Sequence, residues 1–248
     1  MKITKGEPVL LLGPKMYLVN CKGNFECKFG KTNLDSLSGK NFGTILKIGK
    51  ANFTVVKPTF PDFLFRRAAR GPQIILPRDA SLIAGYTGAG KGWKVVDAGA
   101  GSAFLSMFLA NIGCDVTTYE IRKDFYELAR KNIEQSGLKI KVVNSDITKG
   151  IKEKYVDLIT LDMQNPERAI KSAEKSLKAG GWLVVYSMTA EEVTEVVKEI
   201  KKYNFASPRM VQNLPVEWQV EIFGKKTFSR PRTHQLSHTG FLIFARKM

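Results

Sequence analysis

Hydrophobic residues follow one pattern up to about residue 62 of this chain and a different pattern beyond it. In the first part, short apolar runs recur about every ten residues and are separated by Gly, Asn and Pro. Short strands with regular turn signals are typical of a small barrel or sandwich. Two prolines in KPTFPDF (57–63) end this part. The pattern predicts a β-rich N-terminal domain over residues 1–62.

Residues 63–248 alternate between strand and helix spacing. DFLFRRA and PRDASLIAGYTGAG predict helices, and PERAIKSAEKSLKAGG predicts a helix from Pro166 to Gly180–Gly181. The predicted strands lie in WKVVDAG, CDVTTYE, KIKVVNSD, YVDLITLD, WLVVYS, VEWQVEIF and TGFLIFARK. Such alternation indicates an α/β fold with a parallel sheet between helices, and the last two strands are compatible with an antiparallel edge.

A glycine-rich loop, DAGAGS, joins the first of these strands to a helix. Gly99 and Gly101 let the backbone turn tightly and approach a ligand at the helix N-terminus. The dinucleotide fingerprint would need Gly or Ala at position 104, where this chain has Phe104. The loop therefore favours a ligand without a pyrophosphate.

Acidic residues stand at the ends of the next three strands. Glu120 could accept both hydroxyls of a ribose, Asp146 could accept a hydrogen bond from an adenine amino group, and Asp162 follows the fourth strand. The carboxyl ends of parallel strands meet at one edge of a sheet, where ligands bind. One such acid alone is more typical of a solvated surface. The glycine loop, Glu120 and Asp146 at three successive strand ends together predict an adenosine pocket, with S-adenosylmethionine as the cofactor.

Six blocks give the chain a family resemblance: RRAARGPQIILPRDASLI, DAGAGSAFLSMFLA, YEIRKDF, LDMQNPER, LKAGGWLVVY and RPRTHQLSHTGFLIFARK. In this order they resemble the tRNA (adenine-N1) methyltransferases that act on the T-loop, in their archaeal and bacterial homo-oligomeric form. The resemblance implies a class I, Rossmann-like S-adenosylmethionine-dependent methyltransferase domain over residues 63–248 and assembly as a homotetramer. It implies methylation at N1 of the adenine at tRNA position 58, with position 57 as a second candidate.

The same resemblance assigns individual residues. Asp162 would be the catalytic acid that faces the target base. The alternative without a catalytic role is that Asp162 is a helix-capping acid before Pro166. The residues implied for the cofactor are Gly99, Gly101, Ser102, Ala103, Phe104, Leu105, Glu120, Phe125, Asp146 and Asp162. Many members have two prolines after the acid where this chain has only Pro166, and some have a tyrosine where it has Leu76. Any aromatic contact with the base must therefore come from elsewhere.

The charge of the chain points to a polyanionic partner. Its 248 residues include 39 Lys and Arg against 23 Asp and Glu, a formal net charge of +16. Such an excess attracts nucleic acid in a salt-dependent manner, although a basic surface without a specific partner is the alternative. The arginines expected to contact tRNA are Arg66, Arg67, Arg70, Arg230 and Arg232. No basic amphipathic helix, spanning segment or leader is evident, so a cytoplasmic protein without a membrane partner is expected.

The three cysteines, Cys21, Cys27 and Cys114, do not form a zinc motif, because no second Cys/His pair lies near the first two. Reduced structural thiols and no metal are the expectation.

Two other functions remain open at this stage. A protein-repair carboxyl methyltransferase, or another class I enzyme, would have a similar cofactor domain, but the charge and the β-rich first part disfavour it. A catalytically silent tRNA-binding subunit should show a broken glycine loop or lack Asp162, and neither is seen.

Overall fold

The computed structural model describes residues 1–71, 73–224, 226–234 and 238–248, and the chain divides into two compact units, Met1–Ala69 and Arg70–Met248. The boundary expected from the sequence, between residues 62 and 63, falls inside helix α1 (Phe60–Arg66). This helix belongs to the first unit, where Arg66 donates a 3.3 Å hydrogen bond to the carbonyl oxygen of Met16.

The first unit is built from short antiparallel strands. Its elements before α1 are β1 (Pro8–Leu12), β2 (Tyr17–Asn20), β3 (Asn24–Cys27), β4 (Gly30–Asn33), η1 (Leu34–Leu37), β5 (Ile45–Ile48) and β6 (Ala51–Val56). Residues 1–69 are all described and form a four-stranded sheet in the order β2-β1-β6-β5 and a separate β3-β4 hairpin. In β6, buried Phe53 and Val55 alternate with exposed Asn52 and Thr54, so one face of the sheet forms the core. The strand β4, GKTN, has no apolar residue and was not predicted.

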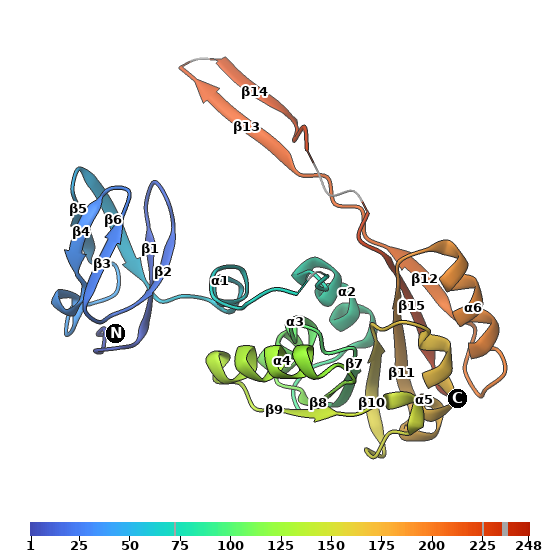
Figure 1. Cartoon of the computed structure of the whole chain (residues 1–248). Helices are drawn as coiled ribbons and strands as arrows, with labels where there is room; N and C mark the ends of the chain where they lie inside the picture. Colours follow the sequence, from blue (N-terminus) through green and yellow to red (C-terminus); the bar gives the residue numbers. More distant parts are fainter. Residues whose placement is uncertain (72, 225, 235–237) are drawn as a thin grey trace. The chain divides into compact units, whose positions relative to one another are not determined.

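The second unit has the alternating order expected from its sequence (Figure 1). Its elements are α2 (Pro77–Thr87), β7 (Lys94–Ala98), α3 (Phe104–Asn111), β8 (Asp115–Glu120), α4 (Lys123–Ser136), β9 (Ile140–Asn144), η2 (Ile147–Lys149), β10 (Val156–Leu161), η3 (Pro166–Ala169), α5 (Ile170–Ser176), β11 (Leu177–Ser187), α6 (Ala190–Ile200), β12 (Arg209–Gln212), β13 (Trp218–Phe223), β14 (Lys226–Pro231) and β15 (Phe241–Arg246).

The described part of this unit contains a seven-stranded sheet in the order β12-β15-β11-β10-β7-β8-β9. The strands from β11 to β9 are parallel, and β15 and β12 add an antiparallel edge. One apolar cluster contains residues of α5 and α6, and another contains residues of α2 and α3. The strand order reverses between β10 and β7, which is where open α/β sheets bind ligands.

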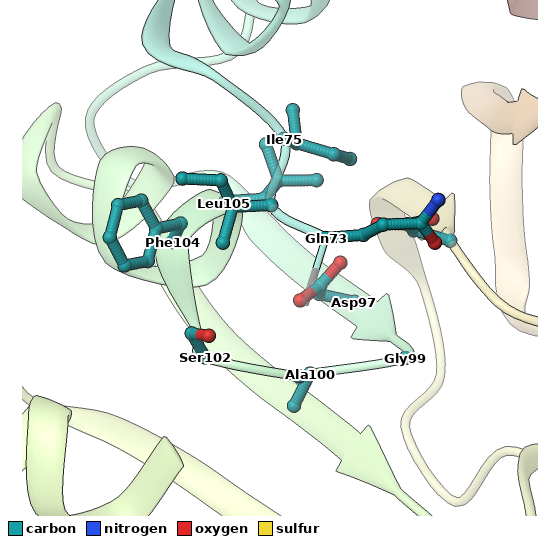
Figure 2. A pocket seen from close by; sticks show the side chains of 11 residues that line it. Gln73, Ile75, Asp97, Gly99, Ala100, Ser102, Phe104 and Leu105 are labelled. Atoms are coloured by element: carbon teal, nitrogen blue, oxygen red, sulfur yellow. The ribbon is translucent and has the colours of Figure 1, made fainter. Parts of the chain in front are cut away.

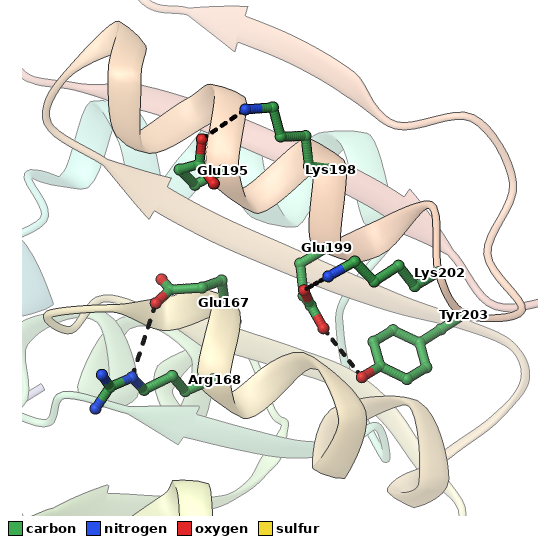
Figure 3. Close-up of polar contacts among 7 residues, drawn as sticks. All are labelled: Glu167, Arg168, Glu195, Lys198, Glu199, Lys202 and Tyr203. Atoms are coloured by element: carbon green, nitrogen blue, oxygen red, sulfur yellow. Dashed lines mark hydrogen bonds and ion pairs between the residues drawn. The ribbon is translucent and has the colours of Figure 1, made fainter.

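Helix α6 shows how the elements on the sheet are stabilised. Its buried side chains Val193, Val196 and Ile200 face the core. On its outer side, Lys198 pairs with Glu195 at 2.8 Å, as Figure 3 shows. Lys202 pairs with Glu199 at 2.7 Å at the end of the helix. Exposed pairs of this spacing add only about 0.2–0.5 kcal/mol each, so burial of the apolar face dominates.

Two details differ from the sequence-based expectation. The helix expected up to Gly180–Gly181 ends at Ser176, because Leu177 is extended (φ −67, ψ 143) and already pairs with Val156. The segment VEWQVEIF was expected at the sheet edge, but β13 pairs with β14 in a hairpin of its own. The antiparallel edge is formed by β15 together with β12, which was not predicted.

The described residues include no helix that is long and apolar enough to cross a membrane. Cys21, Cys27 and Cys114 are free thiols, and the Cys21 Sγ donates to the carbonyl oxygen of Leu34 at 3.3 Å. Within the described ranges, no group of three or more His, Cys, Asp or Glu side chains could hold a metal ion.

Candidate functional site

The glycine loop follows β7 and packs directly against the end of β10. Gly99 has φ +80, and a Cβ atom placed on it would overlap the carbonyl oxygen of Asp162. In the same place, the backbone N–H of Asp162 donates to the carbonyl oxygen of Ala98 at 2.8 Å. Glycine at position 99 therefore allows the catalytic candidate Asp162 to stand beside the loop.

The loop begins at a buried carboxylate. Asp97 is 2% exposed and accepts hydrogen bonds from the hydroxyls of Ser106, Thr118 (3.0 Å) and Thr160 (2.6 Å). Burial raises the pKa of Asp97, and the three hydroxyl groups oppose this rise. Because the donors belong to α3, β8 and β10, Asp97 connects the three elements that surround the loop.

The two acids predicted to hold adenosine also have local partners. Glu120 is buried and accepts from the backbone N–H groups of Gly101 and Arg122, each at 2.9 Å and each on a different oxygen. Asp146 accepts from the Thr148 N–H at 2.9 Å and from its hydroxyl at 2.7 Å, which lowers the pKa of Asp146. Each carboxylate oxygen has two lone pairs, so both side chains retain acceptor capacity for a ligand.

Asp162 lies half-buried just beyond the end of β10. Burial, and then the negative charges of Asp97, Glu192 and Glu120, raise the pKa of Asp162 to about 7. A solvent-exposed aspartate titrates near 3.9. A strongly perturbed acid in a concave site is typical of a functional residue.

A small pocket, partly open to solvent, lies between this loop and the segment that precedes α2 (Figure 2). Its lining residues are Gln73, Ile74, Ile75, Asp97, Gly99, Ala100, Gly101, Ser102, Phe104, Leu105 and Asp162. Six of these were among the predicted site residues. Gln73 to Ile75 were missed, since the only signal for them is their place in the block RRAARGPQIILPRDASLI.

Four predicted cofactor residues do not line this pocket: Ala103, Glu120, Phe125 and Asp146. Ala103 is fully buried in a left-handed conformation (φ +62) at the start of α3. The ring of Phe125 lies under the guanidinium of Arg122, with 4.1 Å between the guanidinium carbon and the ring centre. Ala103 and Glu120 contact the loop from outside the pocket lining, through hydrogen bonds with Ala100 and Gly101.

Residues 54–224 match the model of the family described as "tRNA methyltransferase complex GCD14 subunit". The chain belongs to this family. The match covers more than half of the chain and includes the glycine loop, Glu120, Asp146 and Asp162, so the resemblance noted in the sequence is confirmed.

Named relatives cover most of the chain. A Methanocaldococcus jannaschii protein named tRNA (adenine(57)-N(1)/adenine(58)-N(1))-methyltransferase TrmI is 33% identical over 94% of this chain and 91% of its own. The Thermus thermophilus tRNA (adenine(58)-N(1))-methyltransferase TrmI is 27% identical over 78% of this chain and 76% of its own.

Two crystal structures confirm the class I methyltransferase fold. The tRNA (m1A58) methyltransferase TrmI from Aquifex aeolicus has a TM-score of 0.83 and 26% identity and covers 100% of this chain and 99% of its own. A SAM-dependent O-methyltransferase from Thermotoga maritima has a TM-score of 0.87 and 26% identity, with coverage of 100% and 95%. The two proteins are named for different acceptor atoms, so similarity of fold alone does not fix the substrate.

An aromatic side chain that the sequence did not single out stands beside Asp162 in this GCD14-family fold. Leu161 pairs with Val185 in parallel strands, so Asp162 and Tyr186 are the next residues along β10 and β11. Tyr186 is buried, and a Cβ atom on Gly240 would lie only 2.6 Å from its Cζ. Burial raises the pKa of Tyr186 to about 12, with the charges of Asp79 and Asp162 contributing.

The five arginines expected to contact RNA are divided between the two units. Arg66 and Arg67 belong to the first, where Arg67 donates to the side chain of Asn20 at 2.5 Å. Arg70, Arg230 and Arg232 belong to the second. Arg230 lies on exposed β14 with its guanidinium 5.2 Å from the ring centre of Phe228, and Arg232 pairs with Glu217 at 3.3 Å.

Proposed function

We propose that this chain transfers a methyl group from S-adenosylmethionine to N1 of the adenine at position 58 of the tRNA T-loop, with position 57 as a second acceptor. The observation that carries the proposal is Asp162. It is a half-buried acid with a pKa of about 7 that packs on the glycine loop of a GCD14-family methyltransferase fold. The Methanocaldococcus jannaschii relative supports both acceptor positions by its name.

The residues around the loop fit S-adenosylmethionine. The loop residues Gly99 to Ser102 line the pocket, and Glu120 and Asp146 offer acceptors for ribose and adenine. Phe104 stands where a pyrophosphate-binding loop would need a small residue, which agrees with a ligand that has no phosphate. When bound, the cofactor supplies an electrophilic methyl group on a sulfonium.

Asp162 acts on the acceptor base in this proposal. Its carboxylate accepts a hydrogen bond from the exocyclic amino group of adenine, which shifts electron density toward N1. Methylation at N1 leaves a positive charge on the ring, and a negative carboxylate stabilises that charge as it develops. The base must leave its stack to reach the site. Tyr186 then provides the aromatic wall beside Asp162 that Leu76 does not provide.

The pKa of Asp162 gives a testable pH profile. Only the ionised carboxylate carries the negative charge that stabilises the positive charge developing on the ring, so kcat/KM of the free enzyme should rise with pH and level off above about 7. Below pH 7, each pH unit should lower the rate about tenfold. The measurement is initial-rate methyl transfer to tRNA between pH 5.5 and 9 in buffers of constant ionic strength.

A variant of a neighbouring acid tests whether the inflection near pH 7 comes from Asp162 or from unfolding of the protein at low pH. Glu192 raises the pKa of Asp162 by its charge, so Glu192→Gln should move the inflection to lower pH without removing it. An inflection that stays near 7 in this variant would argue against Asp162 as its source.

The reaction and the acceptor are tested with labelled S-adenosylmethionine and unmodified tRNA, followed by nucleoside mapping. Label at N1 of adenine 58 is the expected result. Label on a hydroxyl oxygen would favour the chemistry named for the Thermotoga maritima neighbour, and transfer to damaged peptide would favour a repair enzyme. Tight tRNA binding without any transfer would indicate a silent subunit.

On the RNA side, we propose that Arg66, Arg67, Arg70, Arg230 and Arg232 contact phosphate oxygens, for which the guanidinium fork is suited. The net charge of +16 supports this role. A tRNA substrate also supports the expected cytoplasmic location.

We further propose a homo-oligomer, a tetramer, in which a second copy covers the β13–β14 hairpin. Trp218, Val220 and Ile222 alternate along β13 and so share one face, and they are 59%, 63% and 73% exposed. Isolated two-stranded hairpins are marginally stable in water. Figure 1 shows the hairpin extending away from the seven-stranded sheet of its own unit.

Charges on this face should weaken the assembly. Val220→Asp with Ile222→Asp should shift the mass in solution from tetramer toward smaller species, because two carboxylates would have to be buried between copies. Multi-angle light scattering after size exclusion measures this directly. Tyr155→Asp, at an 81% exposed position elsewhere in the unit, is the control and should leave the mass unchanged. A monomeric wild type would refute the proposal.

A further inference from the structure

Positive charge is concentrated in the first unit. Residues 1–69 contain twelve Lys and Arg against four Asp and Glu, so they carry +8 of the total charge of +16. The other +8 is spread over the remaining 179 residues. This unit contains neither the glycine loop nor Asp162, so its charge needs a separate explanation.

Three turns of this unit meet at one end. A Cβ atom on Gly13, in the β1–β2 turn, would lie 2.6 Å from Phe53. The ring centre of Phe29, in the β3–β4 turn, is 5.6 Å from that of Phe53. A Cβ atom on Gly49, in the β5–β6 turn, would overlap the carbonyl oxygen of Phe29. We call this region the turn end, and its side chains used below are Lys15, Tyr17, Lys28, Phe29 and Lys50.

Lysines and aromatic rings alternate at the turn end. Lys28 Nζ lies 4.9 Å from the ring centre of Phe29, and Lys15 Nζ lies 5.7 Å from that of Tyr17. Both rings are half-buried, so each keeps an accessible part. The hydrogen bond from Arg66 to the carbonyl oxygen of Met16 places a fourth cation next to Lys15.

The turn-end lysines have no ion pair among the described residues, and the same holds for Lys2, Lys40 and Lys57 of this unit. In α6, Lys198 and Lys202 are paired with glutamates (Figure 3). Among the described residues of the first unit, the lysine ion pairs are Lys5–Asp35 and Lys31–Glu26, outside the turn end. The charge of Lys15, Lys28 and Lys50 is therefore not compensated by a carboxylate within 4 Å in the described chain.

We propose that the turn end is a second RNA-binding surface, which binds the phosphate backbone of the substrate at nucleotides other than the adenine that is methylated. Lysine clusters neutralise phosphates, and accessible rings among them stack on bases without sequence preference. A surface of this kind adds affinity for any tRNA and leaves the choice of the base to the site at Asp162. The inference rests on the proposed function, because it takes tRNA as the substrate.

The test compares two variants of the first unit, each of which loses three positive charges, one at the turn end and one at the opposite end. One variant carries Lys15→Ala, Lys28→Ala and Lys50→Ala. The matched control carries Lys2→Ala, Lys40→Ala and Lys57→Ala. These lysines lie at the far end, because β5 and β6 run from the Gly49 turn to the pair Ile45–Thr54, Lys57 follows β6, and Lys2 bridges to Asn41. All six lysines are exposed, so both variants should melt at the temperature of the wild type.

Binding of unmodified full-length tRNA is measured by filter binding between 50 and 300 mM salt, with methyl-transfer kinetics beside it. The turn-end variant should bind at least about tenfold more weakly, and the magnitude of the slope of log K against log salt should fall by about 2–3, as expected for three lost phosphate contacts. Its KM for tRNA should rise while kcat at saturating tRNA stays at the wild-type value. The control should change Kd less than threefold.

Equal losses of tRNA affinity in the two variants would show that only the overall charge of the unit matters. No loss of affinity in either variant would show that the turn-end lysines are solvated and do not contact RNA. Both results would overturn the inference. A wild type that transfers no methyl to tRNA would overturn the proposed function instead. The two failures are therefore distinguishable in one set of measurements.

Discussion

Replacement of Asp162 by alanine should reduce kcat for methyl transfer to tRNA by about 10²–10³-fold, the usual loss when one preorganised electrostatic partner of the transition state is removed. The variant should bind S-adenosylmethionine with little change, because its backbone contacts to Gly99 and Ala98 do not use the side chain. Single-turnover methyl transfer and calorimetric binding of the cofactor measure the two effects separately.

Two further variants sharpen this result. Asp162→Asn keeps an acceptor oxygen but loses the charge, so it should remain well below the wild type and lose the inflection near pH 7. Asp157→Asn changes the same residue type near the start of β10, where Asp157 accepts from the Lys94 N–H at 2.8 Å and pairs with Lys178. That control should retain the wild-type kcat. Comparable losses of kcat at both positions would mean that Asp162 has a structural and not a catalytic role.

The protonation of Asp162 also has a consequence for stability. Its pKa of about 7 in the folded state lies above the unfolded value near 3.9. The folded state therefore binds the proton more tightly, and stability falls as pH rises from about 4 to 7. Asp162→Asn should consequently melt higher than the wild type at pH 8 and show less gain at pH 5.

Gly99→Ala should be the most damaging change in the loop. Its Cβ would overlap the backbone carbonyl of Asp162, which cannot move without separating β7 from β10. Overpacking of this kind costs about 1–3 kcal/mol or more, and the left-handed φ of +80 adds about 1–2 kcal/mol. Cofactor binding and methyl transfer should both fall by more than about 100-fold, the equivalent of roughly 2.7 kcal/mol.

Gly101→Ala provides the matched comparison. Gly101 also has a positive φ, +51, but the nearest atom to its Cβ would be 3.8 Å away. Only the conformational cost applies, so the melting temperature and cofactor affinity should fall clearly less than in Gly99→Ala. Equal effects would mean that the contact with Asp162 is not what requires glycine at position 99.

Most of the second unit could be predicted because its elements are long and their apolar periodicity is regular. Helix α4 is an example, because it ends at Gly137, whose φ of +71 is a conformation that favours glycine. The failures lie where the partner of a segment is distant in sequence. Leu177 extends the chain early because it pairs with Val156, and β13 pairs with β14 rather than with the sheet edge.

The residues of the site also divide into those with a local sequence signal and those whose place depends on distant parts of the chain. Gly99, Glu120 and Asp162 were predictable because strand ends and glycine turns are local signals. The position of Tyr186 beside Asp162 depends on the register of β10 and β11, which no local pattern contains. Gln73 to Ile75 line the pocket from a segment without regular structure, where periodicity carries no information. The hydroxyls in VTTYE and LITLD were a usable sign that buried strands surround a polar group.

The hydroxyl shell of Asp97 also constrains the order of folding. Thr118 and Thr160 lie 21 and 63 residues from Asp97 along the chain, on the strands that flank β7 on either side. A chain in which β10 has not yet docked leaves this carboxylate without Thr160, and water then competes for it. The cofactor-binding edge is therefore complete only when the centre of the sheet has closed. Ligand binding during refolding should lag behind the recovery of helical signal.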